Sequence, residues 1–500
     1  SPNQPTNQPL TKLFYGDNKE ILVSSHLITN ESIDLCYIDP PFNSNRNYNQ
    51  IYNNEGIDKA QAQAFSDTWE WNDTTITEFT EILNNAHGYT SQTIELISGL
   101  KKVLGDSSLM AYLVSMTVRI NLIWHKLKKT GSFYLHCDPT ASHYLKIICD
   151  SIFCGKERSG EFLNEVVWCY KSGGASKKYF SRKHDIILYY SKTKDHYFKH
   201  LKEKSYGSTG GGQGGKVEYF KDKKGTYSIV GVKDWWIISM LSTTHPERLG
   251  YPTQKPEALL ERIIQSSTNE GDVVLDAFCG CGTTVSVAQK LNRQWMGIDI
   301  TYQSISLILK RLEDTYGKAI SENVVLHGVP KDMDSARALA NKKDDRVRKQ
   351  FEMWAILSYT NNAGIINDKK GADGGVDGII SFGLPNDRKK AIISVKSGKN
   401  VGDDMINSLI GVVQKNNAEC GILILLEEPT KVMTKTALGM GTFSLGEEFP
   451  QKFSKIKIVT IKEILEGNVR VDLPLIRLPL KDAKKNADTT KDLFNPEIID

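Results

Sequence analysis

The stretch VVLDAFCGCGTT, at residues 273–284, runs from a short apolar segment into a turn with two glycines. Glycines directly after a strand permit a tight turn, and they let a ligand approach the backbone where a helix begins. The next apolar run, residues 295–298, ends at Asp299, whose carboxylate can accept both ribose hydroxyls of a nucleoside ligand. The alternative is a tight strand–helix connection in which Asp299 is an ordinary helix N-cap. The spacing fits neither a dinucleotide-binding G-x-G-x-x-G nor a phosphate-binding loop.

Two other apolar, β-branched runs end in the same way, at a small or polar residue. They occupy residues 33–38 and 131–136, and helical patterns lie at residues 109–128 and 256–267. Strands that alternate with helices indicate an α/β core with a mostly parallel sheet. Ligands of such sheets bind at the carboxyl ends of the strands, where all three runs end.

The tetrapeptide Asp39-Pro40-Pro41-Phe42 follows the first of these runs. Two prolines in series fix φ and remove two backbone donors, which gives a rigid corner whose carbonyl oxygens can point into a pocket. Together with the Asp39 carboxylate, they offer several acceptors to an amino group that carries two N–H donors. The Phe42 ring can then stack on a planar base. A simple turn is the alternative, and it is the commoner origin of an isolated Pro-Pro.

The segment YPTQKP, residues 251–256, precedes the amphipathic pattern that leads into the glycine-rich stretch. Pro256 suits the first position of a helix, and Lys255 can bind a carboxylate at that helix N-terminus. An ordinary helix start explains the segment equally well when it is taken alone.

The charge of the chain is unevenly distributed. Residues 171–233 hold 15 Lys and Arg and 5 Asp and Glu, hence +10, which leaves −6 for the rest of a chain whose formal charge is +4. Aromatic residues are interleaved in this basic segment, and the flexible stretch 205–215 lies inside it. Cations neutralise phosphates and planar rings stack on bases, which is typical of a nucleic-acid contact. A solvated basic face with half-buried aromatics is the alternative.

Composition argues against several other classes of protein. The mean hydropathy is −0.36, and no apolar run approaches the roughly 20 residues of a membrane span. The first residues, Ser1-Pro2-Asn3-Gln4, lack the layout of a secretory signal, and the eight cysteines include no C-x-x-C pair. We therefore expect a cytoplasmic protein with reduced thiols and no membrane partner, and the nucleic-acid contact expected of the basic segment would place it at the nucleoid, on DNA.

Taken together, the motifs resemble those of the S-adenosylmethionine-dependent DNA amino-methyltransferases, in the β arrangement of that family. The resemblance covers roughly residues 13–313. It implies a Rossmann-like methyltransferase fold in which the D-P-P-F motif holds and activates a flipped base, the glycine turn binds the cofactor, and the basic segment is an inserted target-recognition region. The implied catalytic residues are Asp39, Pro40, Pro41 and Phe42. The implied cofactor-binding residues are Asp17, Thr253, Lys255, Asp276, Phe278, Gly280, Gly282, Thr283 and Asp299.

The resemblance also favours one target base. Family members with D-P-P-Y/F mostly methylate adenine N6, whereas S-P-P-Y favours cytosine N4, so we expect adenine in duplex DNA and keep cytosine as the alternative. The usual D-P-F reads Asp276-Ala277-Phe278 here, a loss that the glycines and Phe278 should tolerate. A decayed methyltransferase that only binds DNA, and a methyltransferase for small molecules or proteins, are the rival hypotheses. RNA stays open as well.

The C-terminal third shows a second resemblance, over roughly residues 350–459. An acid after a turn, followed by a strand that ends in x-x-Lys, resembles the PD-(D/E)xK fold of the Mrr-type restriction endonucleases. Asp377 would bind a divalent metal such as Mg²⁺, Lys396 would position water or stabilise charge, and Glu352 is a further candidate ligand. The family usually has an acid or Gln at the position of Ser394. A degenerate domain, retained for DNA binding or for contacts between domains, is therefore favoured over active cleavage.

These readings divide the chain into domains. Residues 1–330 form the methyltransferase domain with its insertion at 171–240, residues 331–349 a linker or linking helix, residues 350–465 the α/β endonuclease-like domain, and residues 466–500 a tail. A homodimer and a separate restriction subunit both stay open as partners.

Overall fold

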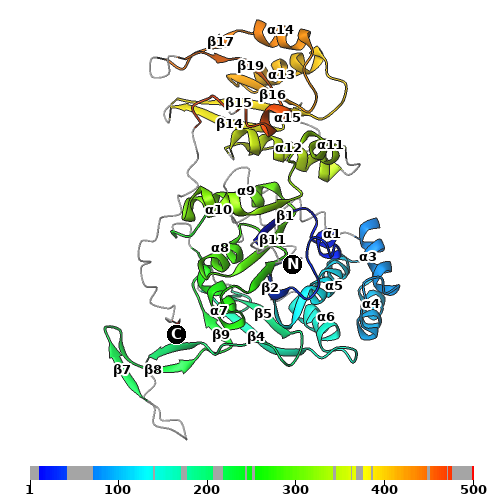
Figure 1. Cartoon of the computed structure of the whole chain (residues 1–500), viewed down its shortest axis with the longest axis vertical. Coiled ribbons are helices and arrows are strands. Elements are labelled where there is room, and N and C mark those ends of the chain that lie inside the picture. The colour runs from blue at the N-terminus through cyan, green and yellow to red at the C-terminus, as the bar shows by residue number, and fades with distance from the viewer. Residues whose placement is uncertain are drawn as a thin grey trace, which may run out of the picture.

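The structure is a computed structural model of a chain with two bodies, shown in Figure 1 as a larger N-terminal and a smaller C-terminal domain. Phe42 and Thr253 lie outside the residues that it describes. The described residues are 11–41, 71–138, 141–170, 177–206, 218–241, 245–249, 254–341, 345–361, 363–367, 375–384, 387–446, 451–469, 471–475 and 498–499.

A nine-stranded sheet forms the centre of the described N-terminal domain. Its strand order is β12-β1-β11-β10-β2-β3-β5-β4-β9. Neighbouring strands are parallel, except that β5 runs antiparallel to both β3 and β4. The predicted α/β fold with a mostly parallel sheet is thereby confirmed. The strands are β1 (Lys12–Tyr15), β2 (Ile33–Ile38), β3 (Leu127–Cys137), β4 (Glu161–Cys169), β5 (His184–Ser191), β9 (Trp235–Ile237), β10 (Val273–Asp276), β11 (Gln294–Asp299) and β12 (Val325–His327).

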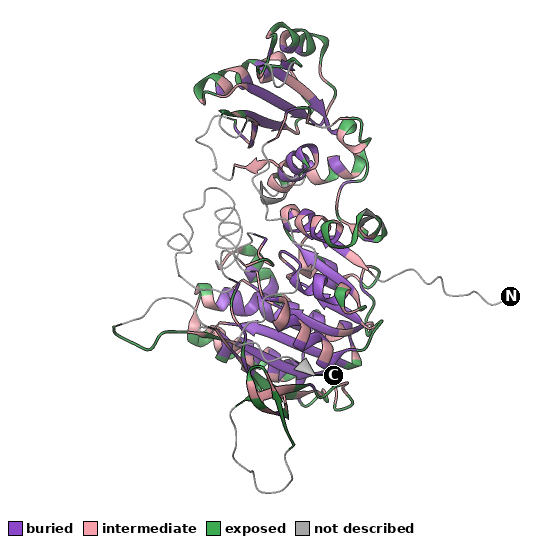
Figure 2. Cartoon of the chain, turned by 90° about the vertical axis from the view of Figure 1, so that its left-hand side faces the viewer, coloured by how far each residue is buried: buried purple, intermediate pink, exposed green. Residues whose placement is uncertain are grey.

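Helices cover both faces of this sheet and bury most of it, as Figure 2 shows. One apolar cluster joins the first face to α1, α3, α4, α5 and α6, and a second cluster joins the other face to α7, α8 and α9. The helices are α1 (Asn18–Val23), α3 (Asp73–Leu83), α4 (Ser91–Leu104), α5 (Ser108–Lys126), α6 (Ser142–Phe153), α7 (Glu257–Ser267), α8 (Thr283–Lys290), α9 (Tyr302–Tyr316) and α10 (Lys318–Asn323). Within the described part of the chain, every helix is too short or too polar to span a bilayer.

Two predicted boundaries differ from the structure. The helix expected at 109–128 ends at Lys126, because Leu127 is already extended and begins the long strand β3. Pro256 is the N-cap of α7 rather than its first residue, since its ψ of 139° is extended. Proline fixes φ alone, so its neighbours determine on which side of the helix boundary it falls.

The basic segment is not one insertion, which corrects the expected range 171–240. Strand β5 lies inside that range but belongs to the central sheet, and its Tyr189 and Tyr190 are buried in the core. Their rings therefore pack inside the protein and are not available for bases. A separate small sheet of order β20-β6-β8-β7 follows β5. Its strands are β6 (Lys202–Tyr206), β7 (Tyr219–Asp222), β8 (Gly225–Gly231) and β20 (Ile498–Ile499).

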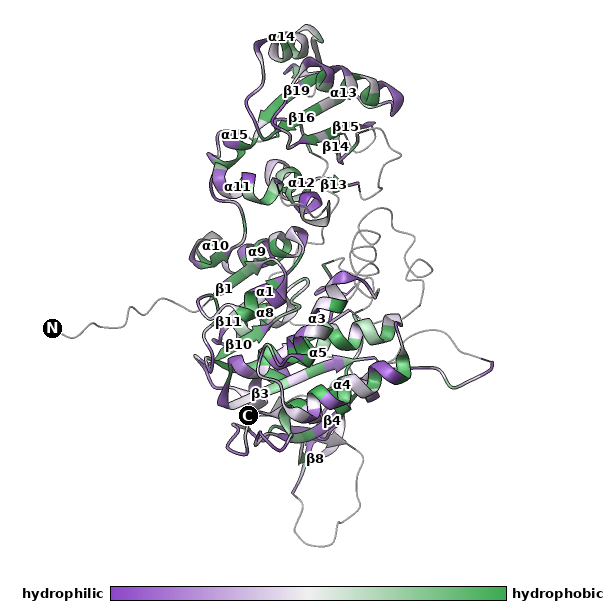
Figure 3. Cartoon of the chain, turned by 90° about the vertical axis from the view of Figure 1, so that its right-hand side faces the viewer, coloured by the Kyte–Doolittle hydropathy of each residue, from purple (hydrophilic) through white to green (hydrophobic). Residues whose placement is uncertain are grey.

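The C-terminal domain is a five-stranded sheet of order β13-β14-β15-β16-β19 with helices around it. Figure 3 shows that its inner strands, such as β16, are strongly hydrophobic. A two-stranded sheet pairs β17 with β18. The elements are α11 (Met333–Ala340), α12 (Asp345–Thr360), β13 (Ile365–Ile366), β14 (Gly378–Leu384), β15 (Asp387–Lys396), α13 (Asp403–Lys415), β16 (Cys420–Leu425), α14 (Lys431–Gly439), β17 (Thr442–Phe443), β18 (Phe453–Ser454), β19 (Ile456–Thr460) and α15 (Ile461–Leu465).

Helices α11 and α12 connect the two domains. Ala336 and Ala340 of α11 are buried in the C-terminal core, so the expected linking segment contributes to that core. Helix α12 also contacts the N-terminal domain: the Tyr15 hydroxyl donates to Gln350 Oε1 at 3.1 Å, and α12 packs on α9. The expected boundary between residues 349 and 350 falls inside this helix.

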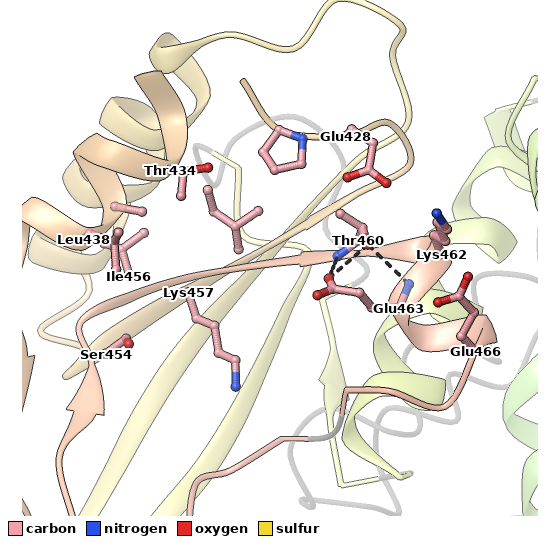
Figure 4. A pocket seen from close by; sticks show the side chains of 13 residues that line it. Glu428, Thr434, Leu438, Ser454, Ile456, Lys457, Thr460, Lys462, Glu463 and Glu466 are labelled. Carbon is pink, nitrogen blue, oxygen red and sulfur yellow. Dashed lines mark hydrogen bonds between the residues drawn. The ribbon is translucent and has the colours of Figure 1, made fainter. Parts of the chain in front are cut away.

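A shallow groove lies between α14, β19 and α15 of the C-terminal domain (Figure 4). Its lining mixes cations and carboxylates, among them Lys457, Lys462 and Glu466. At its floor, Thr460 and Glu463 form the capping box that starts α15. The candidate nuclease residues do not line this groove.

Candidate functional site

Asp39 and Asp276 leave the central sheet side by side. Strands β2 and β10 are parallel neighbours, in register at Leu35 with Val274 and at Cys36 with Leu275. Because the carboxyl ends of neighbouring parallel strands meet at one edge of a sheet, the D-P-P segment and the glycine turn share that edge. The structure thus brings together the two motifs that sequence analysis singled out.

Lys255 reaches the same edge from the segment before α7. Its ammonium group forms an ion pair with the Asp39 carboxylate, and the two side chains are 13% and 16% exposed. We expected Lys255 to bind the carboxylate of a ligand, but its carboxylate partner here belongs to the chain itself. A charge-assisted hydrogen bond between two largely buried groups fixes the direction of the Asp39 carboxylate.

The glycine turn presents bare backbone at the start of a helix. Gly280 and Gly282 have φ values of 47° and 74°, which other residues rarely adopt, and α8 begins directly after Gly282. A Cβ atom on Gly282 would lie 2.6 Å from Ile308 Cγ1. Phe278 is half-buried beside the turn, and Thr283 is buried in the first turn of α8. Gly282 is therefore needed for the close packing of this turn against α9.

Asp276 holds the two ends of the turn together. One carboxylate oxygen accepts the backbone N–H of Phe278 at 3.0 Å, and the other accepts the Thr284 hydroxyl at 2.6 Å. Burial raises the pKa of Asp276 to about 7, although these hydrogen bonds act in the opposite direction. The nearby carboxylates of Asp39 and Asp299 raise this pKa further.

Asp299 stands at the end of β11, on the other side of the turn. Its carboxylate accepts the N–H of Gly280 at 2.9 Å and both the N–H and the hydroxyl of Thr301, at 2.9 and 2.8 Å. Burial raises its pKa, and these hydrogen bonds lower it in part. Asp299 thus ties the glycine turn to the neighbouring strand. Its contact with a ribose remains a prediction.

Asp17 follows β1, whose last residue lies next to Asp299 in the sheet. Strand β1 pairs with β11 so that Tyr15 is opposite Asp299, and the Gly16 N–H donates to the Asp299 carbonyl at 3.0 Å. Asp17 itself caps α1 by accepting the Lys19 N–H at 2.7 Å. The segment that the resemblance assigns to the cofactor is therefore adjacent to the glycine turn.

These features fit S-adenosylmethionine, the cofactor that the resemblance implies. A sulfonium cation nearby would favour the charged form of the buried Asp276 and Asp299 carboxylates, which have no cation among their hydrogen-bond partners in the described residues. A nucleoside needs close approach to the backbone, which the glycine turn provides. Asp39 lies at the same edge of the sheet.

Sequence analysis missed a buried hydrogen-bonded chain beside Asp39. The Tyr37 hydroxyl and His136 Nδ1 are 2.9 Å apart, and His136 Nε2 is 3.0 Å from Asp185 Oδ2. Tyr170 donates to the other oxygen of Asp185 at 3.1 Å. The chain crosses β2, β3 and β5 at the shared edge. The one available signal was a histidine inside the apolar run 131–136.

Sequence analysis also missed a second group of residues, which is linked to the glycine turn. Arg119 of the almost wholly buried helix α5 pairs with Glu78 at 3.0 Å and donates to Asn18 Oδ1 at 2.7 Å. Asn18 in turn donates to the Ala277 carbonyl at 2.9 Å, within the glycine turn. A cation in the middle of a largely apolar helix was the signal that could have revealed this link.

The candidate nuclease residues gather at one end of the C-terminal sheet. Asp377 Oδ2 accepts the Val395 N–H at 2.7 Å and the Ser394 hydroxyl at 3.3 Å. Burial raises the pKa of Glu352, and the charges of Asp377 and Lys396 also act on it. Glu352 is paired with Lys349 at 2.9 Å. In the described residues, no three His, Cys, Asp or Glu side chains form a group that could hold a metal ion.

Comparison with known proteins defines the class of protein. Residues 33–310, more than half of the chain, match the DNA methylase family, and the chain belongs to that family. Residues 349–442 match a second family, described as restriction endonuclease. The chain is thus a DNA methylase with a restriction-endonuclease domain at its C-terminal end, as both resemblances indicated.

Several curated relatives cover the methylase part. The DNA adenine methyltransferase YhdJ of Escherichia coli is 27% identical over 60% of this chain and 82% of its own length. Type II methyltransferase M2.DpnII of Streptococcus pneumoniae is 29% identical, over 61% of this chain and 93% of its own. Type II methyltransferase M1.MboII of Moraxella bovis is 31% identical, over 39% and 78%. The crystal structure of the M1.HpyAVI–SAM complex is 17% identical over 60% of this chain and 98% of that chain, with a TM-score of 0.34.

Proposed function

We propose that this protein transfers a methyl group from S-adenosylmethionine to the exocyclic N6 of adenine in duplex DNA. The observation that carries the proposal is the meeting of the Asp39 corner and the glycine turn on neighbouring parallel strands, in a chain of the DNA methylase family. Adenine is favoured as the target because the motif of this chain is D-P-P-F and not S-P-P-Y, and because one relative is named as an adenine methyltransferase. Cytosine N4 is the alternative target.

The residues at this edge of the sheet have different roles in the proposed reaction. When bound, S-adenosylmethionine supplies an already activated methyl group, so the chain needs no covalent intermediate. Asp39 and the Pro40 carbonyl accept the two N–H donors of the target amine and direct its lone pair toward the methyl carbon. Lys255 fixes the Asp39 carboxylate. The backbone at Gly280 and Gly282 receives the nucleoside part of the cofactor, and a flipped base reaches the edge from the duplex.

The test of this function uses Asp39→Ala with Glu270→Ala, an exposed carboxylate, as the matched control. Each protein is incubated with radiolabelled S-adenosylmethionine and mixed-sequence duplex DNA, and the product nucleosides are identified. We expect N6-methyladenine from the wild type and from Glu270→Ala. Asp39→Ala should bind the cofactor and give no product. Normal turnover of Asp39→Ala would overturn the assignment, and labelled cytosine would overturn the choice of base.

For the C-terminal domain we propose DNA binding, with Lys396 and Lys399 as phosphate contacts. The supporting observation is that Ser394, at the usual position of an acid, donates to Asp377 instead of adding a carboxylate. Magnesium-dependent cleavage that disappears in Asp377→Asn would instead establish a bifunctional methyltransferase–nuclease. Uncut DNA with retained binding supports the proposal.

We further propose the domain division of residues 1–330, 331–349, 350–465 and 466–500, with α11 as part of the C-terminal core. Because DNA is the substrate, we place the protein in the cytoplasm, at the nucleoid. A homodimer and a restriction subunit remain predictions.

A further inference from the structure

Residues 177–183, the described residues directly before β5, lie at the same edge of the sheet as Asp39. Strand β5 is antiparallel to β3, with Ile186 opposite Cys137 at the carboxyl end of β3. Strand β4 ends opposite the start of β5, where Cys169 pairs with His184. Residues 177–183, which lead into β5, therefore lie at the edge where β3 ends, and Asp185 of β5 is joined to Tyr37, two residues before Asp39, through His136. The Tyr170 N–H donates to the Lys183 carbonyl at 3.0 Å and closes the base of the loop.

The described part of this loop, KKYFSRK at residues 177–183, combines positive charge with exposed rings. It holds four cations and no acid. Phe180 is 98% exposed, more than any other large hydrophobic side chain of the described residues. Tyr179 is 64% exposed, and the Arg182 guanidinium lies 5.6 Å from its ring centre. An aromatic ring that is exposed to water and surrounded by cations indicates a binding partner that carries negative charge and flat apolar surfaces.

Duplex DNA fits this chemistry better than an anionic membrane. An anionic membrane also binds cations and exposed aromatic rings, but the proposed reaction does not require a membrane to contact the edge that holds Asp39 and the glycine turn. DNA must reach that edge, since the target base has to leave the duplex there. A flipped base leaves a gap in the stack, and planar or apolar side chains fill such gaps in DNA-bending proteins.

We propose that Phe180 enters the base stack where the target base has been flipped out, while Lys177, Lys178 and Arg182 contact the flanking phosphates. The ring replaces part of the stacking that the extruded base loses, so it stabilises the flipped state. This inference rests on the proposed methyl transfer to a flipped base. It adds a residue that contacts the DNA and not the cofactor.

The test compares Phe180→Ala with Phe198→Ala. Phe198 is 53% exposed, but it lies at the opposite edge of the sheet, where the Lys199 N–H donates to the Ser266 carbonyl at the end of α7. The recognition site is first mapped by sequencing DNA methylated by the wild type. A duplex with 2-aminopurine at the target position then reports flipping through its fluorescence, without and with cofactor.

We expect Phe180→Ala to lower the flipping signal and kcat/KM by about tenfold or more, the loss of one stacking contact. Cofactor affinity and the melting temperature should not change. A mismatch opposite the target base should restore the flipping signal and kcat/KM of Phe180→Ala, because an unpaired base leaves the stack at a lower cost in free energy. Phe180→Trp should keep activity, and its fluorescence should be quenched by the duplex. Phe198→Ala should match the wild type.

Three results would overturn the inference. Flipping and turnover could be normal in Phe180→Ala, or the mismatch could fail to restore them. The variant could also lose binding to phosphatidylserine vesicles while keeping DNA binding, which would assign the loop to a membrane. Failure of the wild type to methylate any DNA would instead refute the proposed function, so the two failures are distinguishable.

Discussion

Asp276→Asn should make the protein more stable at pH 8 and should change how its stability depends on pH. In the folded protein, burial raises the pKa of Asp276 from 3.8 to about 7. The folded state therefore holds a proton that the unfolded state has released between these two values, and stability falls as pH rises through this range. The fall in stability is nearly complete at pH 8, one unit above the pKa of the folded state.

The size of the effect follows from the same two values. One pH unit corresponds to about 1.4 kcal/mol, so an ionised Asp276 destabilises the folded state by about 4 kcal/mol at pH 8. Asparagine cannot ionise, and it can keep both hydrogen bonds: its oxygen accepts the Phe278 N–H, and its amide donates to the Thr284 hydroxyl. The variant should gain up to about 4 kcal/mol at pH 8 and little at pH 4.

Urea unfolding at pH 5, 6, 7 and 8 measures this difference. Hydrogen-exchange mass spectrometry of peptides from β10 follows the central sheet separately from the C-terminal domain, whose unfolding need not coincide. Glu270→Gln, an exposed carboxylate, is the control. A stability difference between Asp276→Asn and wild type that stays constant across pH would refute the reasoning, because the burial of an ionisable group could not then be its source.

Two further predictions concern the same edge. Lys255→Met should lower turnover about 30-fold, since a lost hydrogen bond between charged groups is worth about 2 kcal/mol. Steady-state kinetics measure this loss. The control is Lys290→Met, which breaks a more exposed ion pair and should keep the turnover near that of the wild type. An equal loss in both variants would contradict a special role of the pair with Asp39. Gly282→Ala should destabilise the protein by about 2–4 kcal/mol, because it combines a positive φ with a clash against α9. Gly271→Ala, with a φ of 82° and open space around the Cβ, isolates the backbone part of that effect in thermal unfolding; equal melting temperatures of the two variants would rule out the clash.

The parts of the site that sequence analysis predicted are those encoded by short segments. An apolar run followed by Asp39 or Asp276 marks a strand end, and both ends then meet because parallel neighbours share an edge. The family resemblance added roles that no local pattern contains. The described members of that set, from Asp17 to Asp299, do lie around one edge.

The parts that were missed depend on contacts between distant segments. Strand β5 was read as part of a basic insertion because its flanks are basic, yet its own residues pair with β3 and β4 inside the core. The chain from Tyr37 through His136 to Asp185 is assembled from three strands, so no segment of sequence shows it. Lys255 was assigned to a ligand because the carboxylate that it meets lies 216 residues away.

The small sheet of β6, β7 and β8 bears on which parts of this protein can vary in evolution. In the described residues its strands hydrogen-bond to one another and to β20, while β5 and β9 on either side are fixed in the central sheet. Glu203 of β6 pairs with the buried Arg262 of α7 at 3.2 Å, but substitutions at the exposed positions of the small sheet leave the packing around Asp39 unchanged. A lineage can exchange this piece for another of similar length and keep its chemistry, provided that both attachment strands are retained.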